Sequence, residues 1–233
     1  MENPASYFDL RDKFVRRMVG EVANVWDIIP ALPGMLDDLT LGKRRIKGKI
    51  MPGAEVADGP LYIGTGSVVE PGAYISSSAF IGDNVRIRHG AYLRENCIFL
   101  NGSVLGHASE AKSAMFLPGA KAPHFAYVGD SVLGHHVNLG AGTKISNLRI
   151  LGGVDDTIKL DVEENLIDTG LRKFGAILGD RVQVGCNAVL NPGCLMRRGC
   201  VVYAGTVVPK GIYDADTLIK LRQSLEMDAI VEH

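Results

Sequence analysis

The chain has 233 residues, 46% of them hydrophobic, and its 25 Lys and Arg against 26 Asp and Glu give a formal net charge of −1. This size allows a sizeable core in one large domain, or in one domain with an appendage. The balanced charge excludes the basic excess typical of proteins that bind nucleic acid or membrane surfaces. We therefore expect neither partner, and any anionic ligand must be met by a local cluster of cations.

The lack of a recognisable targeting signal and the pattern of the cysteines predict a cytoplasmic protein. No apolar run approaches the roughly 20 residues of a membrane span. The start, MENPASYFDLRDKF, lacks the charge-then-apolar layout of a secretory signal. The cysteines contain no CxxC pair and suit a reducing compartment better than a disulfide framework; they are Cys97, Cys186, Cys194 and Cys200.

The first 49 residues predict a helical appendage. Residues 6–39 read as one helix, with Ser6 and Asp9 as a capping pair and an end near the IPALPG stretch. One apolar stripe would face inward; it consists of Leu10, Phe14, Met18, Val22, Val25 and Ile29. We expect Phe14 and Trp26 to pack onto the first coil of the domain that follows.

A hexapeptide repeat dominates the rest of the chain. Mostly aliphatic residues recur at every sixth position, at Ile63, Val69, Ile75, Ile81, Ile87, Leu93, Phe99, Leu105 and Ala111. A small residue follows four places later, as at Ser67, Ala73, Ala79, Val85, Ala91, Cys97, Ser103 and Ser109. The phase resumes at Phe116 and again at Leu178. Stacked coils share one apolar interior. The repeat therefore predicts an all-β fold, a left-handed parallel β-helix over residues 50–211 with three short strands per coil.

Two segments interrupt or follow the repeat. Residues 148–176 are too long for a tight turn and predict a projecting arm, with an extended pair of strands around VEEN. Residues 212–233 predict a short helix that closes the last coil.

The coil arithmetic places polar residues in columns, because residues about 18 apart lie one above another. Arg94 and Lys112 form one such column, and His89, His107 and His124 form another. Exposed cations and histidines on a helix wall are by default solvated surface. Two columns of cations and imidazoles suit an anionic substrate, however. Their convergence with Asn138, Asn147, Lys173 and the Gly-rich turn around Ala141 favours a ligand site.

Several stretches resemble the acetyltransferase domain of the bifunctional glucosamine-1-phosphate acetyltransferase and N-acetylglucosamine-1-phosphate uridyltransferase family. They are YLRENC, GHASEAKSA, KAPHFAYVGDS, GHHVNLGAGT, SN, RKFGAILGD and VQVGCNAVLNPG. The likeness covers roughly residues 60–211. LIDTGLRKFGAILGD is closer to the archaeal-type sugar-phosphate nucleotidyltransferases, which carry the same β-helix. The resemblance implies a homotrimer with sites between adjacent helices, acetyl-CoA as the donor and an amino-sugar 1-phosphate as the acceptor.

The same resemblance implies roles for individual residues. It makes His124 the base. It assigns sugar-phosphate contacts to Arg94, Lys112, Tyr127, Asn138 and Lys173, and acetyl-CoA contacts to Ala141, Asn147, Cys186 and Ala204.

The chain departs from the family at three places, the first of which is Leu148, where one branch of the family has Tyr. Cys186 stands where one branch of the family has Ser, and the late Arg that would meet the coenzyme phosphates is replaced by LIKLRQ, where Lys220 or Arg222 could substitute. The Gly-rich G-x-G-T-R type loop of the nucleotidyltransferase domain is missing from the sequence, so we expect no uridyl transfer.

With these roles, the resemblance implies an N-acetyl transfer without a metal. Histidine titrates near neutral pH, which suits His124 to accept the proton of an amine. Arg94, Lys112 and Lys173 would hold the phosphate. A backbone amide or the Asn147 side chain would meet the oxyanion, a contact worth roughly 3 to 4 kcal/mol.

Two other functions stay open. One is a zinc enzyme similar to the γ-carbonic anhydrases, which would need three imidazoles converging on one ion; His135 and His136 lie on a different face from His107 and His124. The other is a non-catalytic nucleotide-sugar binding or assembly module. The sequence does not indicate which amino sugar is the acceptor.

Overall fold

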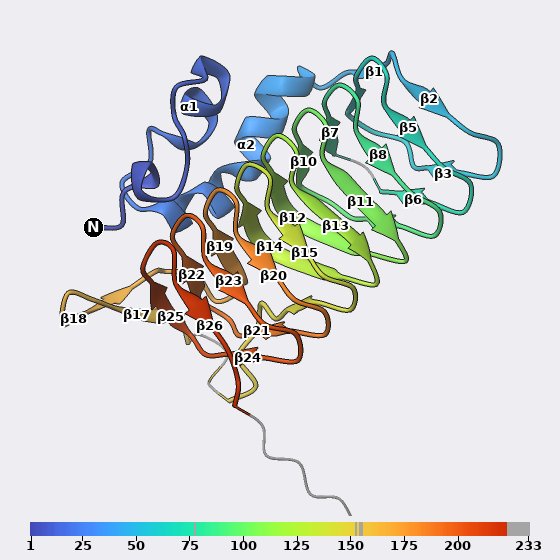
Figure 1. Ribbon diagram of the computed structural model, residues 1–233. Coiled ribbons are helices and arrows are strands. Elements are labelled where there is room, and N and C mark those ends of the chain that lie inside the picture. The colour runs from blue at the N-terminus through green and yellow to red at the C-terminus, as the bar shows by residue number, and fades with distance from the viewer. Residues whose placement is uncertain (77, 152, 154–155, 223–233) are drawn as a thin grey trace, which may run out of the picture.

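The protein is a left-handed parallel β-helix of about ten turns, with helices laid along one outer side (Figure 1). The structure, a computed structural model, describes residues 1–76, 78–151, 153 and 156–222. Each coil contributes strands to three faces, which we call faces 1, 2 and 3 in chain order. The expected fold is confirmed.

The strands of each face pair in parallel, coil upon coil. Face 1 consists of β1 (Arg44–Ile46), β4 (Leu61–Ile63), β7 (Ala79–Ile81), β10 (Cys97–Phe99), the second halves of β12 (Glu110–Phe116) and β14 (Tyr127–Leu133), β19 (Ala176–Leu178), β22 (Cys194–Met196) and β25 (Gly211–Tyr213). Face 2 consists of β2 (Lys49–Ile50), β5 (Val68–Val69), β8 (Arg86–Ile87), β11 (Val104–His107), β13 (Lys121–His124), β15 (Asn138–Leu139), β20 (Gln183–Val184), β23 (Val201–Val202) and β26 (Leu218–Ile219). Face 3 consists of β3 (Glu55–Val56), β6 (Tyr74–Ile75), β9 (Tyr92–Leu93), the first halves of β12 and β14, β16 (Lys144–Ile145), β21 (Val189–Leu190) and β24 (Val207–Val208).

The interior of the coil is filled by the residues of the hexapeptide repeat. Every aliphatic position from Ile63 to Ala111 is buried, and so are the small residues that follow four places later. Phe99 and Phe116 stack inside consecutive coils with ring centroids 4.3 Å apart. The six-residue period therefore marks the inward side of the strands, as expected.

The β-helix is longer than the predicted range of 50–211 at both ends. Its first strand begins at Arg44, and β1 pairs with β4 over 17 residues while β2 pairs with β5 over 19. This change of spacing hides the repeat from a strict six-residue count. At the other end, β25 and β26 form a further part of a coil where a helix was predicted. The helix prediction is wrong for residues 212–222, and the rest of that range lies outside the described residues.

The N-terminal appendage is not the single helix expected. It contains the 3-10 turns η1 (Pro4–Ser6) and η2 (Val25–Asp27) and the α-helices α1 (Lys13–Val19) and α2 (Ile28–Thr40). Asp12 caps α1 through the backbone N–H groups of Phe14 and Val15, and Gly20 ends it, so Ser6 and Asp9 are not its cap. Helix α2 continues through Pro33 to Thr40, past the expected end.

The appendage packs on the outside of face 1, rather than on the first coil. Trp26 is buried there, against a set of outward apolar side chains that includes Ile98, Met115, Val132 and Leu195. Phe14, by contrast, is 43% exposed. The outward side of face 1 is apolar because α2 and its neighbours cover it. Within the described residues, no helix is long and apolar enough to cross a membrane.

The insertion at 148–176 contains a hairpin, as predicted. Strands β17 (Lys159–Val162) and β18 (Asn165–Asp168) pair in antiparallel register around Glu163 and Glu164, both of which have positive φ angles. This is the conformation that a two-residue hairpin turn requires. The arm does not project freely, however. Ile158 and Leu160 are buried in the same outer cluster as Trp26, so the hairpin extends the covering of face 1.

Candidate functional site

The predicted site residues lie mostly along the two edges of face 3. One edge is the corner between faces 2 and 3, which carries the histidine column. The other is the corner between faces 3 and 1, where β12 and β14 bend from one face to the next. Face 3 itself is only a few residues wide, so both edges border one wall of the coil.

The three histidines stack in successive coils, as the spacing predicted. His107 is paired with His124 in the register of β11 and β13, and the rings of His89 and His107 stack with centroids 5.4 Å apart. The Nδ1 atom of His89 lies 2.6 Å from the Pro71 carbonyl oxygen, and that of His107 lies 2.9 Å from the His89 carbonyl oxygen. A carbonyl oxygen only accepts, so each Nδ1 carries a hydrogen. These two rings are anchored to the coil.

His124 differs from the histidines beneath it. Its side chain is exposed, and among the described residues no hydrogen bond fixes its ring, which lies tilted beside Phe125 with centroids 6.5 Å apart. The backbone under it is tightly packed. A Cβ at Gly106 would lie 1.8 Å from the Pro123 carbonyl oxygen, so only glycine allows the turn before His124 to approach this closely. A rigid backbone thus presents an unengaged imidazole.

Three of the four residues predicted to contact the coenzyme lie at the same corner as the histidine column, in the coils that follow His124. The N–H of Gly142 donates to the His124 carbonyl at 3.0 Å, and the N–H of Asn187 donates to the Ala141 carbonyl at 2.8 Å. The next coil adds Cys186 and Ala204 in the same way, with the Gly205 N–H 2.8 Å from the Cys186 carbonyl oxygen. His124, Ala141, Cys186 and Ala204 therefore form one vertical row, whereas Asn147, the fourth residue predicted to contact the coenzyme, lies at the other edge of face 3.

At the other edge of face 3, Arg94 and Lys112 lie one above the other, because β9 and β12 pair Leu93 with Ala111. They are not a bare cation column. Arg94 Nη1 donates to Glu110 Oε1 at 3.0 Å, which raises the pKa of Arg94. Lys112 Nζ lies 3.3 Å from Asp130 Oδ1. Each cation is thus held by a carboxylate of the following coil: Arg94 by Glu110 of β12, and Lys112 by Asp130 of β14.

Asp130 connects Lys112 to two further predicted residues. Its Oδ2 accepts a hydrogen bond from Asn147 Nδ2. Lys173 lines a hollow of about 280 Å³ together with Asp130 and Ser113. The isolated bridge between Leu148 and Lys173 closes the insertion at this corner. Lys173 is brought to the cluster of Lys112 and Asn147 by the return of the insertion, within one chain.

Tyr127 lies on face 3 between the two edges. Burial, with the nearby charges of Glu110 and Asp130, raises the pKa of Tyr127, so its hydroxyl stays neutral in the neutral range. A Cβ at Gly129 would lie 2.7 Å from the Tyr127 hydroxyl and 2.8 Å from Asn147 Nδ2. Glycine at 129 thus makes room for both polar groups on the outer side of the strand.

The remaining predicted residues lie elsewhere. Asn138 is on the outer side of face 2, opposite Lys121 in the register of β13 and β15. Lys220 and Arg222 are exposed, after the last strand. Sequence reasoning missed Glu110 and Asp130, although each is 16 to 18 residues from the cation that it binds and the coil arithmetic could have found them.

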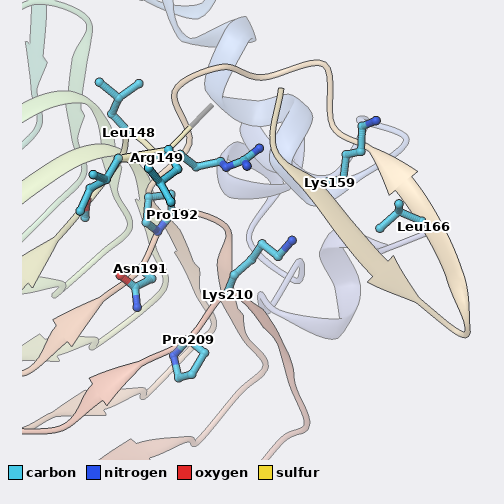
Figure 2. A pocket seen from close by; sticks show the side chains of 11 residues that line it. Leu148, Arg149, Lys159, Leu166, Asn191, Pro192, Pro209 and Lys210 are labelled. Atoms are coloured by element: carbon cyan, nitrogen blue, oxygen red, sulfur yellow. The ribbon is translucent and has the colours of Figure 1, made fainter. Parts of the chain in front are cut away.

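Two other hollows are lined by none of the predicted site residues. At the corner between faces 1 and 2, buried Asp180 accepts hydrogen bonds from the Asp9 N–H at 2.6 Å and the His135 N–H at 2.8 Å. A second hollow of about 590 Å³ lies at the base of the insertion. Figure 2 shows Arg149, Lys159 and Lys210 around it. In the described parts of the chain, no group of three His, Cys, Asp or Glu side chains could hold a metal ion.

In sequence, the chain is similar to bifunctional nucleotidylyltransferase/acetyltransferase proteins. A bifunctional sugar-1-phosphate nucleotidylyltransferase/acetyltransferase of Sulfurisphaera tokodaii is 31% identical over 192 residues, which are 82% of this chain and 46% of that protein. The bifunctional protein GlmU of Methanocaldococcus jannaschii is 29% identical over 88% of this chain and 48% of its own length. The chain therefore spans about half the length of the curated relatives it matches.

Two further comparisons complete these findings. No family model matches the chain. Among solved structures, the polySia specific acetyltransferase NeuO is 13% identical with a TM-score of 0.47, over 73% of this chain and 79% of NeuO.

Proposed function

Because the chain is related over most of its length to the bifunctional sugar-1-phosphate nucleotidylyltransferase/acetyltransferases, we propose that it is an acetyl-CoA-dependent N-acetyltransferase of an amino-sugar 1-phosphate. Glucosamine-1-phosphate is the first acceptor to test. The chain spans only about half of those relatives, so the proposal covers acetyl transfer and not the transfer of a nucleotide.

One observation carries the proposal: face 3 has an unengaged imidazole along one edge and a cation cluster along the other. His124 is exposed at the first edge, whereas Lys112 and Arg94 lie at the second. An amino-sugar 1-phosphate has an amine beside an anionic group. Lying across face 3, it would offer the phosphate to the cations and the amine to His124. Binding the unreactive phosphate then orients the reacting amine.

The transfer uses the residues in a simple order. The amine nitrogen forms a bond to the thioester carbonyl carbon while His124 accepts the proton that the amine loses. The carbon–sulfur bond then breaks, and the proton on the imidazole goes to the departing thiolate of coenzyme A. No metal is needed for either step.

A backbone N–H in the histidine column suits the oxyanion. In the matching turns at the corner of faces 1 and 2, the N–H of Thr65 donates to Asp83 Oδ1 at 2.7 Å, and that of Asp83 donates to Asn101 Oδ1 at 2.9 Å. At the corner of faces 2 and 3 itself, the N–H of His89 donates to Glu70 Oε2 of the coil below at 3.0 Å. The N–H at this position of the turn therefore faces outward. The matching residue in the coil above Ala141 is Cys186, whose side chain is a poor acceptor. The Ala141 N–H is accordingly the better donor for a ligand oxygen.

The vertical row of Ala141, Cys186 and Ala204 would receive the coenzyme, with its thioester at the level of His124. Asn138, on the far side of the His124 corner, would contact the sugar. A single convex wall does not enclose a ligand, so the proposal includes a cyclic homotrimer in which a neighbouring coil closes the groove over face 3.

The test is acetyl-CoA turnover with a panel of amino-sugar 1-phosphates, measured as released thiol. Turnover that requires both the amine and the 1-phosphate would support the proposal. Binding of a nucleotide sugar with no thiol release across the panel would favour the non-catalytic module instead. Carbon dioxide hydration that is lost on chelation would favour the zinc enzyme.

A further inference from the structure

Asp130 occupies the point where face 3, face 1 and the root of the insertion meet. It lies in β14 where the strand bends around the corner, and its side chain is 8% exposed. The N–H of Gly175 donates to its carbonyl oxygen at 2.8 Å, and the N–H of Phe174 donates to the Asn147 carbonyl oxygen at 2.9 Å. The chain returning from the insertion is therefore tied to residues 130 and 147 by its backbone.

The backbone at this corner does not require a carboxylate. Asp130 has a φ of 45°, and the corner residues in the coils beneath it are Ser78, Asn96 and Ser113, with φ of 64°, 59° and 44°. Short polar side chains tolerate this left-handed conformation better than most. Serine and asparagine serve the same turn in three other coils, so the negative charge at 130 has another reason.

The negative charge at 130 is explained by two hydrogen bonds that the carboxylate accepts, one on each oxygen. Asp130 Oδ1 accepts from Lys112 Nζ at 3.3 Å, and Oδ2 accepts from Asn147 Nδ2. The side chains of Lys112 and Asp130 are only 15% and 8% exposed. A buried carboxylate with a donor on each oxygen holds both donors in place, because losing either contact leaves a charged atom without a partner.

The contact also determines the direction of the Asn147 amide. A carboxylate only accepts, so it selects the NH₂ side of the amide. Among the described residues no group donates to Asn147 Oδ1, so this oxygen is left to accept a hydrogen bond from a ligand.

We propose that Asp130 is a positioning residue of the face 3 site: its carboxylate turns the Asn147 amide so that the oxygen is presented to the ligand, and holds the Lys112 ammonium beside it. The acceptor amine, which has N–H groups to donate, is the ligand group that this oxygen fits. Asn147 is then an acceptor in the site, and the oxyanion contact falls to a backbone amide. This inference rests on the proposed function.

The kinetic test compares two buried carboxylates. In Asp130→Asn the corner keeps a residue type that Asn96 already accommodates, but one of the two donors faces an NH₂ group. We expect kcat to fall about 100-fold, as for other small displacements of reacting groups, with a smaller change in KM. Asp180→Asn is the matched control: its side chain is 3% exposed, and it binds the N-terminal segment away from face 3. Asp180→Asn should lower the midpoint temperature of unfolding and leave kcat unchanged.

A double-mutant cycle identifies the residue through which Asp130 acts. In an Asn147→Ala background, Asp130→Asn should lower kcat little further, because the amide that it orients is gone. Losses that simply add would overturn the proposal. If the asparagine variant does not fold, Asp130→Ser gives the same cycle with the residue type found at positions 78 and 113.

A crystal structure of Asp130→Asn provides a readout that needs no activity. We expect the Asn147 amide to rotate or the Lys112 ammonium to move away from position 130. Unchanged positions of both groups would overturn the proposal, whether or not the wild-type protein transfers acetyl groups. Absence of turnover in the wild type would, by contrast, refute the proposed function and leave this structural result to decide the role of Asp130.

Discussion

Replacing His124 with Ala separates a catalytic histidine from a structural one. Its ring is exposed and makes no hydrogen bond within the described residues, so its loss should change the free energy of unfolding by less than about 0.5 kcal/mol. A positioned acid–base group contributes roughly 100-fold to 10,000-fold to turnover, which is about 2.7 to 5.5 kcal/mol of barrier. Activity and stability should therefore respond very differently.

His107→Ala is the matched control, one coil lower in the same column. Its ring is anchored to the His89 carbonyl at 2.9 Å and stacks on His89, so this variant should lose about 0.5 to 1.5 kcal/mol of stability and keep its kcat. The assay measures kcat by thiol release and unfolding by denaturant. Equal kcat losses in the two variants would refute the assignment, as would a His124→Ala enzyme that keeps full turnover.

Further expectations concern the surroundings of the site. Gly129→Ala should reduce kcat/KM about 10-fold to 100-fold with an unchanged fold, because its Cβ would displace Tyr127 and Asn147; equal activity would show that this crowding is relieved without effect. Tyr127→Phe should lower the activity by the same factor at pH 7 and at pH 9, because the raised pKa of Tyr127 keeps its hydroxyl neutral at both. A loss of activity confined to pH 7 would contradict this. Cys186 is the exposed cysteine, so a thiol reagent should label one cysteine per native chain, more slowly with acetyl-CoA bound; labelling of the three buried cysteines would contradict the fold.

The repeat predicted the coil because each aliphatic position is an inward side chain that only stacking can bury. The prediction weakened where coil length changes. At the start, Ile46 pairs with Ile63 over 17 residues and Ile50 with Val69 over 19, so a fixed period misses the first coil. The last coil looked helical for the same reason, because Val202 pairs with Ile219 over 17 residues.

The appendage was mispredicted because its helices are held by tertiary packing more than by local signals. Pro30 and Pro33 suggested an end, yet α2 continues since Leu32 and Leu36 are buried on face 1. For the candidate site, by contrast, the sequence pattern did predict part of the arrangement. Column arithmetic predicted the stacking of Arg94 under Lys112 and of His107 under His124, as the strand register has them, but it follows residues of one kind. The carboxylates that bind those cations therefore escaped attention until the side chains were in place.

We propose that one ligand lies across face 3, between His124 and the cations. A crystal structure of the protein with coenzyme A and the N-acetylated sugar 1-phosphate tests it most directly. We expect the phosphate at Arg94, Lys112 and Lys173, with the acetamido nitrogen about 2.6 to 3.2 Å from a ring nitrogen of His124. A sugar phosphate bound at another corner of the coil, with the imidazole of His124 out of its reach, would contradict it.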